Sequence, residues 1–293
     1  MRVDEFDIAG ASDIGKKRSE NQDHFLIADL RRQLVVRQSD IAEDDQGEIF
    51  GCQEGHLLVV ADGMGGHDSG EVASRKAVQA SAKYVLDMMH WFLKLTPRDE
   101  DDFVDELANC LRSIQEQIWS ESPAGQRRMG TTVTMAYVLW PKLYIVHAGD
   151  SRCYMMRRQN FQQLTTDHTI AQQLVSTGTL TEEEAAKGNW GHVLWNCVGG
   201  GEDVVQPEVI RCDLKEDDTL LLCSDGLTGM LSDETIRRVV LEQTCSRSTV
   251  ETLVQEANDA GGKDNISVVV CRFNHPRNCN SFSDANPCDT TIS

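Results

Sequence analysis

The sequence predicts an α+β fold in which β-sheets are covered by helices. Short apolar, β-branched runs occur in groups, and these groups alternate with pairs of segments whose apolar residues recur every three or four positions. Polar motifs that are expected to act together extend from residue 18 to residue 267. The 293 residues are therefore expected to form one large domain rather than two separate ones.

The first sixty residues are predicted to be strands and turns. Apolar runs at 25–28 and 34–36 are typical of short strands, and Leu57–Ala61 is typical of a buried strand. Residues 38–55 are polar and acidic, which predicts an exposed hairpin or loop.

Two helices are expected next. The segment 69–95 has one apolar stripe at helical spacing, formed by Ala73, Ala77, Ala80, Tyr84, Met88, Trp91 and Leu95. Residues 96–102 include Pro97 and several acidic residues and are interpreted as a turn. A second helix, which ends near the turn at 122–125, is predicted by a stripe formed by Phe103, Leu107, Leu111, Ile114 and Ile118. Core packing is the preferred interpretation of such stripes, with partner binding as the alternative.

The chain then returns to strands. Three apolar runs between 131 and 157 are separated by short turns, as in an antiparallel meander. Residues 170–177 are predicted to form a short helix, and Thr181–Glu184 is a capping box that begins another. Residues 188–201 are rich in Gly and Trp and are predicted to be a loop.

The last part of the chain alternates again. A strand is predicted at 218–223, helices near 232–241 and 247–260, and a final strand at 266–273. Residues 274–293 lack any periodicity and are predicted to be a disordered tail.

Composition excludes several functional classes. A formal net charge of −19 disfavours binding to nucleic acid or to an anionic membrane. The N-terminus lacks the features of a signal peptide, and no apolar run approaches the roughly 20 residues of a membrane span. The ten cysteines show no CxxC pair and are interpreted as free thiols in a reducing compartment. The cytoplasm is therefore the expected location.

Five aspartates lie at the ends of apolar runs. Asp62, Asp150 and Asp225 directly follow such runs, whereas Asp23 and Asp264 come just before them. Each of them alone could be a turn or cap residue. A carboxylate at the end of a strand is held rigidly, and its oxygens suit hard cations such as Mg²⁺ and Mn²⁺. The repeated arrangement therefore predicts one oxygen-rich metal site.

Seven short motifs include these aspartates. In chain order they are RSENQD at 18–23, ADGMGGH at 61–67, GTT at 130–132, GDSR at 149–152, DH at 167–168, SDGL at 224–227 and GGKDNIS at 261–267. This ordered set resembles the metal-dependent protein phosphatases, the type 2C Ser/Thr phosphatases, over roughly residues 6–273. The form with Met64 is similar to the bacterial branch, because animal members have a histidine at that position.

The resemblance implies a fold and an activity. The fold would be a four-layer α-β-β-α sandwich, in which two central antiparallel sheets are flanked by helix pairs. A catalytic domain would occupy residues 1–273, with a flap beside the active site at about 169–201, and the tail would follow at 274–293. Phosphoserine and phosphothreonine in proteins would be hydrolysed by a hydroxide that bridges two Mg²⁺ or Mn²⁺ ions, without a covalent enzyme intermediate.

The family's metal ligands are carried over by position. They would be Asp23, Asp62, Gly63, Asp150, Asp225 and Asp264. Asp62 would bridge the two core ions, and the carbonyl of Gly63 would bind one of them. Asp225 and Asp264 would hold the other ion, and Asp23 would act largely through bound water. Asp150 would join Asp225 in binding a possible third ion.

The catalytic set implied by the resemblance is Arg18, Asp62 and Asp225. Arg18 occupies the position of the family's phosphate-binding arginine, although an ordinary exposed basic run is the alternative interpretation. Gln22 replaces a metal-associated Glu of many members, which removes one negative charge. With Met64 in place of the histidine, the expected proton donor is a metal-bound water.

Residues near the expected flap have less certain roles. His168 matches a family motif whose role is taken as structural. Trp190 and Trp195 are candidates for contacts with a phosphopeptide, and packing of their loop is the alternative.

The expected function is that of a metal-dependent Ser/Thr protein phosphatase. Its partners would be phosphorylated Ser/Thr proteins and an opposing Ser/Thr kinase, and a monomer is expected. Two alternatives remain on the same fold: a non-catalytic phospho-recognition protein and a phosphatase of small metabolites.

Overall fold

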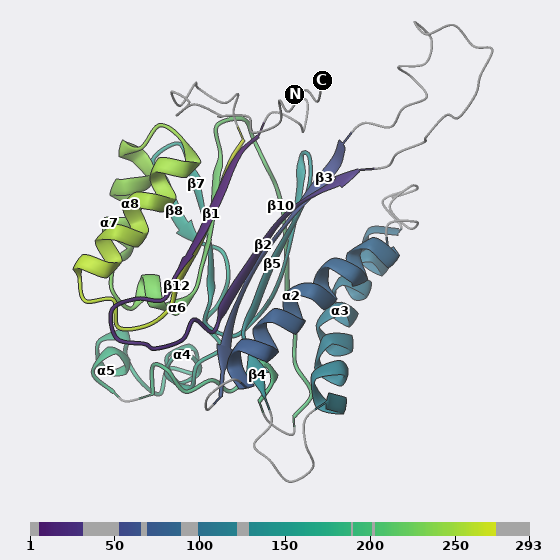
Figure 1. Cartoon of the computed structure of the whole chain (residues 1–293), viewed down its shortest axis with the longest axis horizontal. Coiled ribbons are helices and arrows are strands. Elements are labelled where there is room, and N and C mark those ends of the chain that lie inside the picture. Colours follow the sequence, from purple (N-terminus) through teal and green to yellow (C-terminus); the bar gives the residue numbers. More distant parts are fainter. Residues whose placement is uncertain are drawn as a thin grey trace, which may run out of the picture.

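Two antiparallel sheets lie at the centre of the molecule, and helices cover their outer faces (Figure 1). The computed structural model describes residues 6–31, 53–65, 69–88, 99–121, 129–188, 190–200 and 203–273. The chain passes between the two sheets several times, so both are built from distant parts of the sequence.

One sheet has seven strands, in the order β10-β6-β5-β3-β4-β9, with β2 paired to β3. Its strands are β2 (Asp23–Arg31), β3 (Gln53–Met64), β4 (Gly130–Thr131), β5 (Val133–Leu139), β6 (Lys142–Ala148), β9 (Val198–Gly199) and β10 (Glu208–Asp213). The long β2–β3 pair places Asp23 directly opposite Asp62. Two of the predicted site residues are therefore neighbours through strand register alone.

The other sheet has five strands, in the order β1-β12-β11-β7-β8. They are β1 (Asp7–Asp13), β7 (Arg152–Arg157), β8 (Asn160–Gln163), β11 (Thr219–Cys223) and β12 (Ile266–Arg272). Because β11 and β12 are antiparallel neighbours, the last residues of β11 and the first residues of β12 lie side by side at one end of these strands. Asp225 and Asp264 lie just beyond these two ends.

Two pairs of long helices form the outer layers (Figure 1). Helices α2 (Ser69–Met88) and α3 (Asp99–Glu121) cover the seven-stranded sheet, and α7 (Asp233–Glu242) and α8 (Ser246–Asp259) cover the five-stranded sheet. The shorter helices are α4 (Ile170–Ser176), α5 (Glu182–Lys187) and α6 (Asp225–Thr228). Figure 1 shows α4 and α5 at the end of the sandwich where β4 lies.

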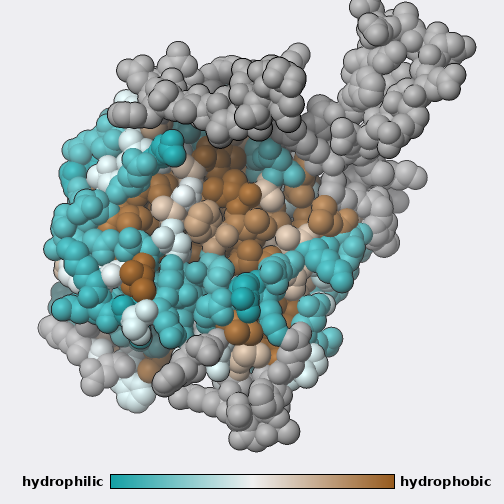
Figure 2. Space-filling view, in the orientation of Figure 1, coloured by the Kyte–Doolittle hydropathy of each residue, from teal (hydrophilic) through white to brown (hydrophobic). Residues whose placement is uncertain are grey.

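Alternation along the strands explains the layering. In β3, Leu57 and Val59 face the core shared with α2 and α3, whereas Leu58 and Val60 face the core between the sheets. Both faces of the strand are buried at Leu57–Ala61, so this run is apolar throughout. Figure 2 shows hydrophobic residues gathered along the middle of the molecule, with hydrophilic residues over the helices on either side.

The structure therefore confirms the predicted α+β fold, the four-layer α-β-β-α sandwich with two central antiparallel sheets. The second predicted stripe is also confirmed, because all five of its residues are buried in the core under α3. The first stripe is confirmed at Ala73, Ala77 and Met88, whereas Ala80 and Tyr84 are only partly buried.

The structure differs from the predicted elements at three places. Helix α3 begins at Asp99, inside the segment interpreted as a turn, because acidic residues are favourable in the first turn of a helix. Strand β10 was not predicted, since its residues are mostly half-buried and lack a clear alternation. The predicted loop at 188–201 contains the two-residue strand β9.

Some predictions fall outside the described residues. They are the strand at 34–36, most of the loop at 38–55, the stripe residues Trp91 and Leu95, the turn at 122–125 and the tail at 274–293.

Two findings bear on the cellular setting. No helix within the described ranges is long and apolar enough to cross a membrane. Six described cysteines are free thiols, as expected, namely Cys110, Cys153, Cys197, Cys212, Cys223 and Cys271. Cys245 is disulfide-bonded, which the sequence analysis did not expect.

Candidate functional site

The five aspartates come together at one end of the sandwich. Asp23 begins β2, Asp62 lies near the end of β3, and Asp150 lies in the β6–β7 loop. Asp225 is the first residue of α6, and Asp264 precedes β12. Except for Asp23, which lies deeper, all of them line one cavity of about 790 Å³, and Gly63 lines it too.

The backbone at Asp62 is held by the two threonines of the GTT motif. The Asp62 carbonyl oxygen accepts hydrogen bonds from the Thr131 hydroxyl and the Thr132 amide, both at 2.8 Å. The Asp62 amide donates to the Thr132 hydroxyl at 3.0 Å. Both threonines are buried, and their hydrogen bonds fix the end of β3.

Asp23 joins the two sheets. Its Oδ2 atom accepts a hydrogen bond of 2.6 Å from the hydroxyl of Ser224, and the Ser224 hydroxyl accepts one from the Ser267 amide at 2.9 Å. Ser224 immediately precedes Asp225, so this chain of bonds connects β2 with the segment that carries Asp225. Asp23 Oδ1 is buried and has no hydrogen-bond partner within the described structure.

The loop that carries Asp264 is tied to the loop that carries Arg18. Asn265 accepts a hydrogen bond from the Gln22 amide at 2.8 Å and donates to the carbonyl oxygen of Glu20 at 2.9 Å. A Cβ atom at Gly226 would overlap the carbonyl oxygen of Asn265, so a glycine is required where α6 meets this loop.

Burial and mutual repulsion raise the pKa values of the clustered carboxyls. Burial raises the pKa of Asp23 to about 7, with further contributions from Asp225 and Asp264. Burial raises the pKa of Asp150 to about 8, again with a contribution from Asp225. The pKa values of Asp62 and Asp225 are also raised, with burial as the main cause. A cation bound among these carboxyls would stabilise their ionised form.

The donor set fits divalent cations. Asp225 Oδ1, like Asp23 Oδ1, is buried without a hydrogen-bond partner in the described part of the chain. Buried polar atoms normally have partners, so two unpartnered carboxylate oxygens in one acidic cluster indicate ligand positions. Oxygen donors of this kind are the ones that Mg²⁺ and Mn²⁺ prefer.

Arg18 reaches the same cavity but faces an aspartate. Its Nε atom donates to Asp264 Oδ1 at 2.7 Å, and its Nη2 atom donates to Asp264 Oδ2 at 2.5 Å. This pair raises the pKa of Arg18. The guanidinium is therefore beside the site as predicted, and it neutralises one of the clustered carboxylates.

Gln22 and Met64, the two departures from the family pattern, both line the cavity. The Gln22 carbonyl oxygen accepts from the Gly63 amide at 3.1 Å and from the Ser74 hydroxyl at 2.6 Å. The backbone of Gln22 thus supports the turn at Gly63.

Sequence reasoning missed two cavity residues. His192, in the segment expected to be the flap, places Nδ1 3.9 Å from Asp225 Oδ2. Lys263 also lines the cavity. The second lies within the GGKDNIS motif and could have been noticed there, whereas an exposed loop histidine carries no sequence signal.

The two candidate tryptophans are not among the cavity-lining residues. Trp190 is 53% exposed and Trp195 is 37% exposed. The Trp195 ring packs against His168, with 5.1 Å between ring centroids, which favours loop packing for Trp195.

Comparison with known proteins gives consistent matches. The family model described as protein phosphatase 2C matches residues 33–260. Protein phosphatase PhpP of Streptococcus pneumoniae is 30% identical over 276 residues, which cover 92% of this chain and 98% of PhpP.

Two solved structures are similar over almost their whole length. The serine/threonine phosphatase PstP/Ppp of Mycobacterium tuberculosis has a TM-score of 0.69 at 30% identity, covering 92% of this chain and 99% of that one. A catalytic domain of PstP in complex with two manganese ions has a TM-score of 0.67 at 31% identity, covering 91% of this chain and 97% of that one.

Proposed function

This chain belongs to the protein phosphatase 2C family and is a Ser/Thr protein phosphatase, and we propose that it carries out hydrolysis in the aspartate-lined cavity. The observation that carries this proposal is the convergence of five aspartates, two of which have buried oxygens without partners. The phosphoserine and phosphothreonine specificity agrees with the similarity to PstP/Ppp, a serine/threonine phosphatase.

We assign the metal ligands to the same six residues that the sequence predicted. Asp62, with the carbonyl of Gly63, would hold core ions from β3, and Asp225 and Asp264 would hold them from the facing sheet. Asp23 would act largely through bound water, and Asp150 would join Asp225 in holding a possible third ion. We propose two Mn²⁺ or Mg²⁺ ions and a possible third. When bound, such ions activate water as a nucleophile and neutralise charge on the phosphoryl oxygens.

Arg18 is the proposed phosphate-binding residue. A guanidinium binds two oxygens in one plane, whether they belong to a carboxylate or to a phosphate. In the structure, Arg18 makes this two-point contact with the Asp264 carboxylate. An Asp264 that coordinates a cation needs less neutralisation by arginine, so the same fork becomes available to a substrate phosphate.

The chain's own charge explains why these cations matter. The protein has a formal charge of −19, so a phosphorylated substrate is repelled by most of its surface. Arg18 and Lys263 are the basic side chains among the cavity-lining residues. They would draw the phosphate toward the site and orient it there.

We further propose a cytoplasmic, monomeric enzyme that opposes a Ser/Thr protein kinase. The similarity to PstP/Ppp, a serine/threonine phosphatase, supports the kinase, since such a phosphatase needs phosphorylated substrates. A pull-down with phosphorylated cell extract, followed by size-exclusion chromatography, tests the partner and the oligomeric state.

The deciding experiment is hydrolysis of a phosphothreonine peptide with Mn²⁺, comparing wild type with Asp225→Asn. We expect turnover that is abolished by EDTA and falls at least 100-fold in the variant, because the substitution removes a charged metal ligand. The exposed Glu216→Gln variant is the matched control and should keep wild-type activity.

Three outcomes would contradict the proposal. Undiminished turnover in excess EDTA excludes the metal site as the catalytic centre. Phosphopeptide binding without turnover in saturating Mn²⁺ favours the phospho-recognition alternative, and faster turnover of sugar phosphates than of peptides favours the metabolite phosphatase.

A further inference from the structure

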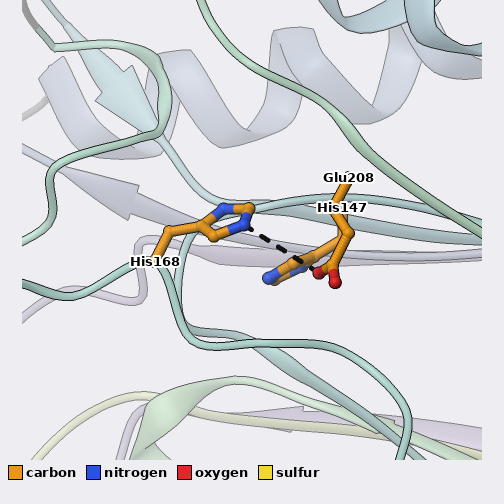
Figure 3. Close-up of side chains that lie close together, drawn as sticks. All are labelled: His147, His168 and Glu208. Carbon is orange, nitrogen blue, oxygen red and sulfur yellow. Dashed lines mark ion pairs between the residues drawn. The ribbon is translucent and has the colours of Figure 1, made fainter. Parts of the chain in front are cut away.

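A second cluster of ionisable side chains lies outside the aspartate cavity. His147, His168 and Glu208 bring their candidate ligand atoms within 4.8 Å of one another, and Figure 3 shows His168 directed toward the Glu208 carboxylate. His147 and His168 are buried, and their rings lie 4.8 Å apart. The composition alone is compatible with a metal site, so the hydrogen bonds of each atom decide its role.

The ring nitrogens of His147 are already engaged. Its Nε2 atom lies 3.0 Å from the Thr166 carbonyl oxygen, and its Nδ1 atom lies 2.9 Å from the Thr134 hydroxyl. Burial lowers the pKa of His147 to about 3, so the ring is neutral, donates from Nε2 and accepts at Nδ1. Glu208 is also engaged, because it accepts hydrogen bonds from the Thr166 amide and hydroxyl at 3.0 and 3.1 Å. The cluster is therefore a hydrogen-bond network rather than a metal site.

His168 has the most informative position in this network. Its Nδ1 atom accepts a hydrogen bond from the Gly149 amide at 3.1 Å and another from the Asn196 side-chain amide at 2.9 Å. Both partners are donors, so Nδ1 carries no proton and the ring proton resides on Nε2. Nε2 lies 3.9 Å from Glu208 Oε2, the contact drawn as a dashed line in Figure 3. Burial lowers the pKa of His168, so the ring is neutral and this contact is not a charge pair.

This one nitrogen connects the catalytic loop with both ends of the flap segment, defined as residues 169–201. Gly149 directly precedes Asp150, His168 directly precedes the flap segment, and Asn196 lies near its end. Backbone bonds strengthen the junction: the His168 amide donates to the Gly149 carbonyl at 2.8 Å, and the Trp195 amide donates to the His168 carbonyl at 3.0 Å.

The neighbouring segments leave the junction little freedom. Gly149 has a φ of +122°, and a Cβ atom there would collide with Thr132, which itself fixes the backbone of Asp62. Asn196 is held through a pair of bonds to the backbone of Gln206, at 2.7 and 3.0 Å. His168 thus lies between two segments that are each anchored elsewhere.

We propose that His168 is a positioning residue that uses its unprotonated Nδ1 to hold the flap segment against the loop that carries Asp150. This inference rests on the proposed function, because Asp150 matters only as a ligand of the metal centre. The side chain does not touch the substrate. It sets where Asp150 lies and how the flap segment closes the cavity, to which His192, Val193 and Leu194 contribute.

The test compares His168→Asn with His168→Gln. An asparagine amide oxygen can take the place of Nδ1, whereas the longer glutamine places its amide nearer the position of Nε2. Hydrogen–deuterium exchange in EDTA is followed in peptides covering 147–151 and 190–200. We expect exchange in both peptides to rise roughly tenfold in His168→Gln, as for loss of one buried hydrogen bond, and to stay near the wild-type rate in His168→Asn.

Two further variants separate positioning from general destabilisation. Asn196→Ala removes the flap-side donor, so exchange is expected to rise in 190–200 but not in 147–151. Glu208→Gln changes the same cluster without touching Nδ1 and should leave both peptides unchanged. If His168→Gln does not fold, the test rests on Asn196→Ala. An equal rise of exchange in peptides 147–151 and 190–200 of that variant overturns the proposal.

An activity measurement completes the test. The Mn²⁺ concentration for half-maximal phosphopeptide turnover is expected to rise roughly tenfold in His168→Gln, with His168→Asn close to wild type. Equal behaviour of the Asn and Gln variants, or unchanged exchange in both, overturns the role of Nδ1. Exchange needs no substrate, so its outcome is separate from failure of the proposed function, which an inactive wild-type enzyme would reveal.

Discussion

Replacing Asp23 by asparagine should stabilise the metal-free protein at high pH and destabilise it at low pH. Burial raises the Asp23 pKa from 3.8 to about 7, so the metal-free folded state keeps a proton that the unfolded chain has lost. Stability therefore falls as pH rises from about 4 to about 7, and the full cost, present above the folded pKa, is about 4 kcal/mol.

Asparagine removes that cost but introduces a different one. Its amide nitrogen would take the place of Oδ1, which has no partner among the described residues. An unsatisfied buried donor costs about 1–3 kcal/mol. The variant should therefore be more stable than wild type by about 1–3 kcal/mol at pH 8 in EDTA, and less stable by a similar amount at pH 4.

Thermal unfolding followed by circular dichroism is the assay. Each kcal/mol corresponds to about 2–4 °C in melting temperature for a domain of this size. When melting temperature is plotted against pH, the lines for wild type and variant should cross between pH 4 and pH 8. Saturating Mn²⁺ should restore the wild-type protein to the more stable position at pH 8, since binding stabilises only a folded state that binds the ion. The exposed Glu216→Gln variant should show neither effect. A variant that melts below wild type at both pH values in EDTA would refute the reasoning.

Three other predictions test the frame around the site. Arg152→Lys should cost about 2 kcal/mol in urea unfolding, because the planar fork of Arg152 binds Asp167 through three bonds of 2.7–3.1 Å; an unchanged midpoint contradicts this. Leu222→Ala should cost about 3 kcal/mol by the same measurement, since Leu222 is fully buried between the sheets, and a loss below 1 kcal/mol would place it outside a well-packed core. Iodoacetamide should leave phosphatase activity unchanged, because burial raises the pKa of Cys197, which lines the cavity, to about 11 and that of Cys223 to about 12; rapid inactivation with alkylation of either thiol would show otherwise.

Much of the fold was predictable because each layer leaves a periodic trace. The run Leu57–Ala61 is buried on both faces, and the stripe from Phe103 to Ile118 faces one core, so strand and helix periods are both visible in the sequence. Strand β10 leaves no such trace, since it is a half-buried edge strand. The start of α3 was hidden because the acidic residues that suggested a turn also favour a helix N-terminus.

The carboxylates of the candidate site and Arg18 were predictable from the sequence, whereas Lys263 was missed. Carboxylates at strand ends are visible as soon as the strands are, and the register of β2 on β3 then places Asp23 opposite Asp62. The bond from Ser224 to Asp23 and the pairing of Arg18 with Asp264 are contacts across more than 200 residues of sequence. The bonds of Thr131 and Thr132 to Asp62 span 69 and 70 residues. No local pattern records such contacts.

Those unpredicted contacts explain why the carboxylates stay clustered at all. Carboxylates that repel one another would separate if their backbone could move, and their pKa values would then be ordinary. Here Thr131 and Thr132 hold the end of β3, and Ser224 holds Asp23 against the facing sheet. Because these hydrogen bonds keep the carboxyls in place, burial and repulsion raise their pKa values. The carboxylates are therefore held together before any cation arrives, and the proposed divalent ions would bind without a prior rearrangement of the site.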